Sequence, residues 1–150
     1  MRMVVASDHG GFPLKARLIE ELRHMGHTVT DLGGDGTDPL DDYPDYAKAV
    51  AEAIQQGRAE RAVLICGSGA GACVAANKFR GIRAATCHDS FSAHQCVEDD
   101  NCNVLCMGAR VVGPSLAGEL ARDYANAKFS GAERHQRRVS KIAAFEAEFK

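Results

Sequence analysis

The sequence predicts an α/β fold: a three-layer sandwich with helices on both faces of a five-stranded parallel sheet. Short apolar and β-branched runs alternate along the chain with segments whose apolar residues recur at helical spacing. Strands that alternate with helices form βαβ units, and the helices then cover both faces of the parallel sheet. We found no repeat, low-complexity tract or linker, so we expect one domain over residues 1–150.

The expected strands are short apolar runs at about residues 2–7, 27–32, 61–66, 83–87 and 103–107. The expected helices are amphipathic segments at about residues 12–25, 44–56, 70–78, 90–98, 114–127 and 136–148. In the first helix, Leu14, Leu18 and Leu22 recur at helical spacing. The loop at residues 33–39 is rich in turn formers, and Pro44 suits the first turn of the helix that follows.

Polar residues gather where the expected strands end. Asp8 and His9 follow the first strand, Cys66 ends the third, and His88 and Asp89 follow the fourth. Right-handed crossovers place the carboxyl ends of parallel strands, and the loops after them, along one edge of the sheet. We therefore expect these side chains to lie along a common edge.

Composition and charge exclude several classes of function. Apolar residues make up 45% of the chain and charged residues 25%, which is ordinary for a globular protein. The net charge of −2 offers no basic surplus for a nucleic-acid footprint, and there is no apolar run of membrane-spanning length. The first residues have the pattern of a strand and lack a signal-peptide core, so we expect a cytoplasmic enzyme.

The chain has six cysteines, none in a CxxC pair: Cys66, Cys73, Cys87, Cys96, Cys102 and Cys106. We expect neither a disulfide framework nor a zinc site, because there is no secretion signal and no tight Cys/His spacing. Most of these cysteines fit the role of small buried apolar residues. Cys66 differs from the others because it ends a strand directly before a glycine-rich loop.

That loop, Gly67 to Gly71, opens the third helix, and a helix N-terminus presents free N–H groups and partial positive charge. Such a position stabilises a thiolate and binds anions. Cys66 is therefore a candidate reactive thiol, although a buried structural thiol is the alternative. The hydroxyl of Ser68 either caps the helix or donates to an oxyanion beside the thiol.

The same loop also fits a different class of function. Gly67, Gly69 and Ala72 match the dinucleotide-binding fingerprint, and Asp89 follows the next strand at about the spacing of that motif. Three features oppose it: the motif is in the third βα unit, a cysteine precedes its first glycine, and few residues remain for a substrate site. A non-catalytic nucleotide or sugar-phosphate module is thus the alternative to an enzyme.

Two further groups are ambiguous when taken alone. Asp8 and His9 are either a turn feature or ligands for hydroxyl and phosphate groups beside Cys66. Arg134 and Arg138 have the i,i+4 spacing that puts two guanidinium groups on one helix face, where they suit a phosphate. The alternative interpretation is that both arginines are solvent-exposed residues at the start of a helix. Arg110, after the fifth strand, is a third candidate, and the C-terminal segment reaches the site by folding back or by crossing to a second subunit.

Together these segments make the chain similar to ribose-5-phosphate isomerase type B, a family that includes galactose-6-phosphate isomerase subunits. The resemblance covers nearly the whole chain and rests on Asp8-His9-Gly10-Gly11-Phe12, Asp42-Tyr43-Pro44, Cys66-Gly67-Ser68-Gly69-Ala70-Gly71, Ala75-Ala76-Asn77-Lys78, His88-Asp89-Ser90-Phe91-Ser92-Ala93, Asn103-Val104-Leu105, Gly108-Ala109-Arg110-Val111-Val112-Gly113 and Arg134-His135-Gln136-x-Arg138. It implies a Rossmann-like sandwich and a metal-free, cofactor-free aldose–ketose isomerase of the pentose phosphate pathway. It also implies a homodimer, sometimes paired into tetramers, with active sites shared across the interface.

The resemblance also implies roles for individual residues. Cys66 matches the base that forms the enediolate, and Gly67, Ser68, Gly69, Ala70 and Gly71 match the loop around the C1–C2 end of the sugar. Asp8 and Tyr43 match positions near the sugar hydroxyls. The residues that match phosphate ligands, some supplied by the partner chain, are His9, Arg110, Arg134 and Arg138.

The segment from Asp99 to Cys102 departs from the family pattern. The family commonly has His-Asn-Asp here, and its histidine opens the furanose ring. This chain has Asp99 in place of that histidine, followed by Asp100 at a substrate-binding position. A carboxylic acid has an unperturbed pKa near 4 and is a poor acid at neutral pH. Either another group opens the ring, or the preferred substrate is one that needs no opening, such as a tetrose 4-phosphate.

Overall fold

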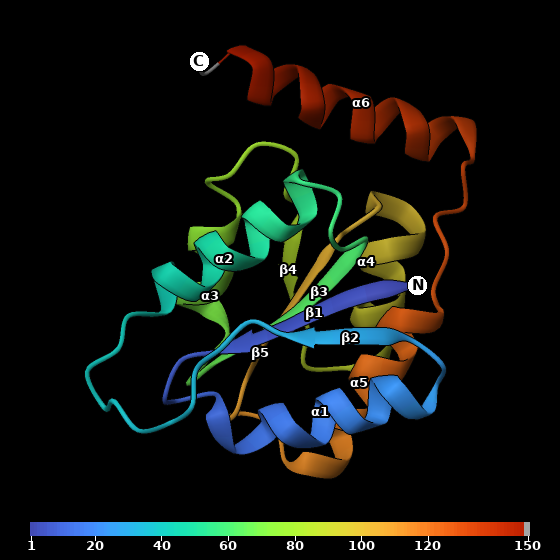
Figure 1. The fold of residues 1–150 in the computed structure, drawn as a ribbon. Helices are drawn as coiled ribbons and strands as arrows, with labels where there is room; N and C mark the ends of the chain where they lie inside the picture. Colours follow the sequence, from blue (N-terminus) through green and yellow to red (C-terminus); the bar gives the residue numbers. More distant parts are fainter. Residues whose placement is uncertain (149–150) are drawn as a thin grey trace.

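The computed structural model describes residues 1–148 and contains a five-stranded sheet in which every pair of neighbouring strands is parallel. The strands are β1 (Arg2–Ser7), β2 (Thr28–Asp31), β3 (Arg61–Cys66), β4 (Ala84–Thr86) and β5 (Val104–Gly108). Their order across the sheet is β2-β1-β3-β5-β4. Figure 1 shows helices on both faces of this sheet, which confirms the predicted α/β sandwich.

The helices are α1 (Phe12–His24), α2 (Tyr43–Gln55), α3 (Ala70–Ala76), α4 (Ser90–Asp100), α5 (Pro114–Asn126) and α6 (Glu133–Glu148). A proline in the first turn begins α1, α2 and α5, where its missing N–H costs no hydrogen bond. The largest error of the sequence analysis is at α6. That helix begins three residues earlier than expected, so Arg134 lies in its first turn.

Two hydrophobic clusters cover the two faces of the sheet. Successive β3 side chains alternate between them: Val63 and Ile65 pack with α1, α4 and α5, whereas Leu64 and Cys66 pack with α2 and α3. The strand is buried on both faces, as its continuous apolar run predicts. Cys66 thus ends β3 on the face covered by α2 and α3.

The strand order reverses between β1 and β3. From β1 the chain passes through α1 to β2 on one side, and from β2 it returns through α2 to β3 on the other side. In open parallel sheets, ligands bind in the crevice beyond the strand ends at such a reversal. The loops after β1 and β3, which carry Asp8 and Cys66, meet there: the N–H of Asp8 donates to the carbonyl of Ile65 at 3.3 Å.

Helix α6 is arranged differently from the other helices. It extends past the rest of the fold in Figure 1 and makes its helix contacts chiefly with α4. Among its described residues, His135 is the buried one, whereas Ile142 and Phe145 are 47% and 57% exposed. A helix of this length gains most of its stability from packing, and in this chain much of the apolar face of α6 is exposed.

All six cysteines lie in the described part of the chain and are free, and five of them are buried. This confirms that they do not form a disulfide framework. Over residues 1–148, no helix combines the length and the apolar character needed to span a membrane.

Candidate active site

The loop after β3 holds the thiol of Cys66 against its own main chain. Gly69 has a φ of +84°, a left-handed conformation that favours glycine, and a Cβ atom there would come 2.9 Å from the carbonyl carbon of Met107. The turn directs the Gly69 N–H at the sulfur of Cys66, 3.0 Å away. A hydrogen bond from a main-chain N–H favours the thiolate form of a cysteine.

Neighbouring loops fix this turn from two sides. The Ala109 N–H donates to the Cys66 carbonyl at 2.9 Å, and the Arg110 N–H donates to the Gly67 carbonyl at 3.0 Å. On the β1 side, Gly11 packs directly against the carbonyl of Ile65, where no side chain fits. The ends of β1, β3 and β5 are therefore locked together around the thiol.

A cleft of about 370 Å³ opens beside the turn. Its lining combines the thiol with polar, cationic and small residues: Asp8, Tyr43, Cys66, Gly67, Ser68, Gly71, Arg110 and Val111. All of these residues except Val111 are among the site residues that the sequence analysis named. The cleft lies at the strand reversal, where the fold predicts a ligand.

Neighbouring groups hold the polar side chains that line the cleft in place. Asp8 is 7% exposed and accepts a hydrogen bond from the Gly11 N–H at 2.9 Å. The guanidinium group of Arg110 lies over Gly67. A Cβ atom added to Gly67 would come 3.4 Å from the central carbon of this guanidinium group. The ring of Tyr43 similarly covers Gly71. A carboxylate, a phenol and a cation thus surround the space next to the thiol.

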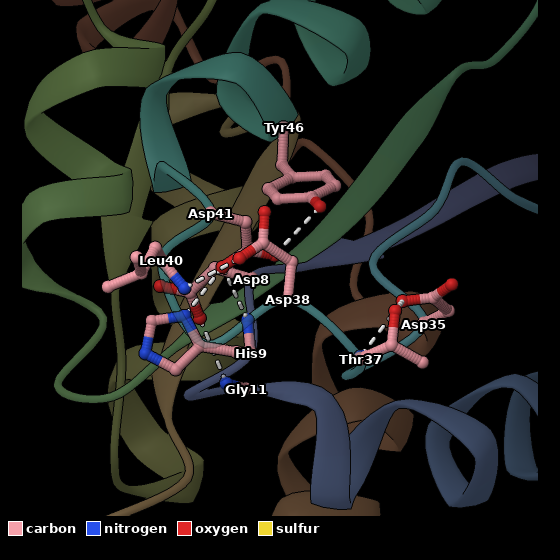
Figure 2. A network of polar contacts seen from close by, with 9 residues as sticks. All are labelled: Asp8, His9, Gly11, Asp35, Thr37, Asp38, Leu40, Asp41 and Tyr46. Atoms are coloured by element: carbon pink, nitrogen blue, oxygen red, sulfur yellow. Dashed lines mark hydrogen bonds and ion pairs between the residues drawn. The ribbon is translucent and has the colours of Figure 1, made fainter.

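His9 sits beside this cleft in a polar network that Figure 2 shows. Its ring Nδ1 lies 2.5 Å from Asp41 Oδ1, which also accepts the His9 main-chain N–H at 3.0 Å. The other oxygen of Asp41 accepts the hydroxyl of Tyr46 at 2.8 Å. The hydrogen bond to Asp41 is the main cause that raises the pKa of His9 above its ordinary value of 6.5, with Asp8 adding to it and burial and Arg110 opposing it.

Ligand-type atoms of Asp8, His9 and Asp41 lie within 4.8 Å of one another. The sequence spacing gave no sign of this group, because Asp41 is 32 residues from His9. The short contact between His9 and Asp41 already uses one ring nitrogen as a hydrogen-bond donor. The expectation that no metal takes part remains a prediction.

Known proteins share this fold and these motifs. A family model described as Ribose/Galactose Isomerase matches residues 3–142. The chain belongs to the ribose/galactose isomerase family. It is 44% identical over 144 residues to a probable ribose-5-phosphate isomerase B of Mycoplasma pneumoniae, covering 96% of this chain and 94% of that protein. It is also 40% identical over 131 residues to D-erythrulose-4-phosphate isomerase of Pectobacterium atrosepticum, covering 87% and 86%.

A solved structure of ribose-5-phosphate isomerase B from Clostridium thermocellum agrees with the whole fold. It matches with a TM-score of 0.95 and 41% identity over all of both chains. The resemblance inferred from the motifs is confirmed. Membership of this isomerase family identifies an enzyme and decides against the alternative of a non-catalytic binding module.

Within the isomerase cleft, Ser68 is exposed and its Oγ accepts the Ala70 N–H at 3.3 Å. The N-cap residue of α3 is Gly69 and no side chain caps the helix, so this contact is a local bond across two residues and not the helix cap that the sequence analysis gave as one alternative. The bond uses an oxygen lone pair and leaves the hydroxyl hydrogen available. Ser68 therefore remains a candidate donor to an oxyanion.

Seven predicted site residues are not among those that line the cleft within the described chain. Three of them, His9, Gly69 and Ala70, belong to the segments directly after β1 and β3, and the other four are Asp99, Asp100, Arg134 and Arg138. Asp99 is at the end of α4, with one oxygen 3.5 Å from Nε2 of the buried His135 and the other accepting from Gln95 at 3.0 Å. Asp100 lines a separate hollow of about 710 Å³ that α6 also borders. These acidic residues belong to the α4–α6 end of the molecule.

Arg134 and Arg138 are exposed on α6. Arg134 Nε donates to His135 Nε2 at 3.0 Å, which ties it to the start of its own helix. The possibility that this segment folds back over the Cys66 cleft of its own chain does not describe the structure, because none of the described residues of α6 lines that cleft and Figure 1 shows α6 set apart from the loops after β1 and β3. The alternative, crossing to a second subunit, stays open.

Two features were missed from sequence. Asp41 directly precedes the motif that contains Tyr43, yet nothing in the local pattern links it to His9. Cys73, interpreted as a packing residue, is half-buried, and a hydrogen bond from Cys106 is the main cause that lowers the pKa of Cys73 to about 6. Cys73 does not belong to the cleft lining, and its thiol donates to the carbonyl of Ala84 at 3.4 Å.

Proposed function

We propose that this isomerase interconverts a phosphorylated aldose and its 2-ketose, with ribose 5-phosphate and ribulose 5-phosphate as its substrates. One observation carries the proposal: a thiol bonded to a main-chain N–H at 3.0 Å faces a cleft that also holds a buried carboxylate and an arginine. The chemistry needs a base beside C2 and N–H donors beside the two oxygens. The lining of the cleft supplies the thiol as the base and the glycine-rich loop as the source of N–H donors.

In the proposed reaction, the Cys66 thiolate removes the proton from C2 of the open-chain aldose. The electron pair moves to the carbonyl oxygen at C1, and the loop amides and Ser68 hold the resulting enediolate. The thiol then returns the proton to C1, while the proton of the C2 hydroxyl passes to the oxygen on C1, so that C2 becomes the carbonyl carbon and C1 carries the hydroxyl. Asp8 and Tyr43 orient the sugar hydroxyls, and His9 and Arg110 bind the phosphate.

We propose further that the enzyme is a cytoplasmic homodimer built from one domain per chain, with α6 of each chain completing the site of the other. The apolar face with Ile142 and Phe145 is exposed, and Arg134 and Arg138 lie outside their own cleft. Two arginines on one helix suit a phosphate. Crossing of α6 to a second copy covers the apolar face and brings both arginines to a phosphate.

A coupled assay for ketose phosphate formation tests the proposal directly. Ribose 5-phosphate should be turned over without an added nicotinamide cofactor or metal ion. Erythrose 4-phosphate is the second substrate to test, because Asp99 replaces the ring-opening histidine and one relative is named for a tetrose phosphate. Its O4 carries the phosphate, so it forms no five-membered ring. The absence of turnover with both sugar phosphates would contradict the proposal.

A further inference from the structure

The polar network around Asp41 extends beyond the residues to which the proposed reaction gives a role. Asp41 lies in the loop between β2 and α2, and its side chain is 12% exposed. Both of its oxygens have partners, His9 on one and Tyr46 on the other. A carboxylate with so little contact with water needs a positive or hydrogen-bonding partner, and the His9 ring supplies it.

The geometry fixes which side of the His9 ring is free. An ionised carboxylate only accepts hydrogen bonds, so Nδ1 of His9 carries a hydrogen and directs it at Asp41. Figure 2 shows the second ring nitrogen on the side away from Asp41. Within residues 1–148 that nitrogen has no hydrogen-bond partner, and 35% of the His9 side chain is exposed.

His9 is flanked by residues at the cleft. Asp8, the preceding residue, lines the cleft, and Gly10, the following one, packs against the main chain of Gly67. A neutral His9 would offer a lone pair at Nε2, which repels a phosphate, whereas a protonated His9 offers an N–H donor and a positive charge. Asp41 favours the second form.

We propose that Asp41 is a positioning residue for phosphate recognition: its carboxylate, itself held by Tyr46, orients the His9 ring and keeps an Nε2–H donor directed at the phosphate of the substrate. The proposal rests on the proposed function for the identity of the anion. It assigns to Asp41 and Tyr46 a role that neither the motifs nor the cleft lining indicates.

The charges around His9 support this assignment. Asp41 and Asp8 raise the pKa of His9, and Arg110 and burial lower it, with a net increase above 6.5. A phosphate monoester has a second pKa near 6, so it is a dianion at pH 7 to 8. An unassisted histidine is mostly neutral in that range. By raising the pKa of His9, Asp41 widens the pH range in which the histidine cation and the phosphate dianion coexist.

The test compares wild type with Asp41→Asn and uses inorganic phosphate as the probe. NMR of labelled histidine gives the titration midpoint of His9, and calorimetry gives phosphate affinity at pH 6.0 and pH 8.0. Asparagine keeps the shape and the acceptor but lacks the charge. We expect a lower His9 midpoint in the variant, with phosphate binding at pH 8.0 weakened roughly tenfold for each unit by which the midpoint falls. Binding at pH 6.0 should change less than binding at pH 8.0, since a larger share of the variant's His9 is protonated at the lower pH.

The matched control is Asp35→Asn, which removes a carboxylate from the same loop. Asp35 bonds to Thr37, and Figure 2 shows this pair apart from the His9 group. Its substitution should leave both the His9 midpoint and phosphate affinity unchanged. Tyr46→Phe removes the second partner of the Asp41 carboxylate, and we expect it to shift the His9 midpoint less than Asp41→Asn does.

Three results would overturn the role of Asp41. The first is a titration midpoint of wild-type His9 at or below 6.5, and the second is unchanged phosphate affinity in Asp41→Asn. The third is an equal loss of phosphate affinity at both pH values, which would mark a purely structural role. The titration of His9 in the wild-type protein tests the proposal even if the Asp41→Asn variant does not fold. None of these measurements needs turnover. If they succeed while no sugar phosphate is isomerised, the proposed function fails and the role of Asp41 in binding phosphate stands.

Discussion

The carboxyl edge of the sheet and the α4–α6 end of the molecule both carry residues of the family motifs, but they are built differently. At the edge, Asp8 and Cys66 are 7% and 4% exposed, and main-chain hydrogen bonds join the loops that hold them. At the other end, Arg134 and Arg138 are exposed on a helix with a single buried side chain among its described residues. The edge is a pre-formed wall, whereas α6 has side chains that need a partner surface.

This difference separates two kinds of contribution to catalysis. A preorganised wall can stabilise a transition state, because its donors need not reorganise during the reaction. A mobile or partner-supplied cation contributes mainly to holding the phosphate, which has the same charge in the substrate and in the transition state. Substitutions in the two regions should therefore affect different kinetic constants.

The largest effect should follow from Cys66→Ala, which removes the proposed base. We expect kcat to fall by roughly 10²- to 10⁴-fold, the range for general acid–base catalysis, while phosphate still binds. Steady-state kinetics on a folded variant measures this change. Near wild-type turnover would refute the thiolate base.

Cys73→Ala is the matched control for that experiment and should keep its activity. Because the pKa of Cys73 is lowered to about 6, iodoacetamide should alkylate both thiols. A sugar phosphate should protect Cys66 and leave Cys73 reactive, which mass spectrometry of the peptides resolves. Equal protection of both thiols would place the ligand elsewhere.

In the α6 region, Arg134→Ala and Arg138→Ala should raise KM more than they lower kcat. Loss of a charge-assisted hydrogen bond costs about 1.5–3 kcal/mol, so kcat/KM should fall roughly ten- to a hundredfold. A larger loss in kcat than in KM would place these arginines in the chemical step instead.

Subunit mixing sharpens the same comparison. When Cys66→Ala and Arg138→Ala chains exchange, a shared site predicts recovery to roughly a quarter of wild-type kcat/KM, since half the dimers are mixed and each mixed dimer has one intact site. No recovery, with exchange verified by mass spectrometry, would show that each chain builds its own site.

A smaller effect is expected at Asp99, which contacts His135 rather than the Cys66 cleft of its own chain. We expect ribose 5-phosphate to have the higher kcat/KM, and Asp99→His to change its ratio to erythrose 4-phosphate little. The ratio is measured with both sugars in one coupled assay. Preference for the tetrose, with Asp99→His improving the pentose reaction alone, would show that this substitution sets the substrate.

The smallest expected effect is that of chelation. Asp8, His9 and Asp41 have ligand atoms within 4.8 Å of one another, but loop amides suffice to hold an enediolate. Exhaustive dialysis against a chelator should leave kcat unchanged. A loss of activity that a divalent ion restores would assign these three residues to a metal site.

The sequence by itself determined the sheet and the edge of the sheet at which the Cys66 cleft lies. Alternating apolar runs and amphipathic segments set the strands and helices to within a few residues, and parallel βαβ topology then places every loop after a strand at one edge. Tyr43 was assigned only through the family resemblance, but for this topological reason Asp8, Cys66, Ser68 and Arg110 could be predicted to share a site. Their positions follow from chain direction alone, without knowledge of any long-range side-chain contact.

Only the tertiary structure decided the pairing of Asp41 with His9 and the position of α6. Asp41 lies in a loop whose path depends on packing over α2, and a loop of turn formers has no periodicity that reports its neighbours. No strand follows α6, so no crossover rule fixes where this helix lies. The orientation of its apolar face depends on the surface against which it packs. Local pattern specifies elements and chain direction, whereas contacts between distant side chains arise from the packed fold.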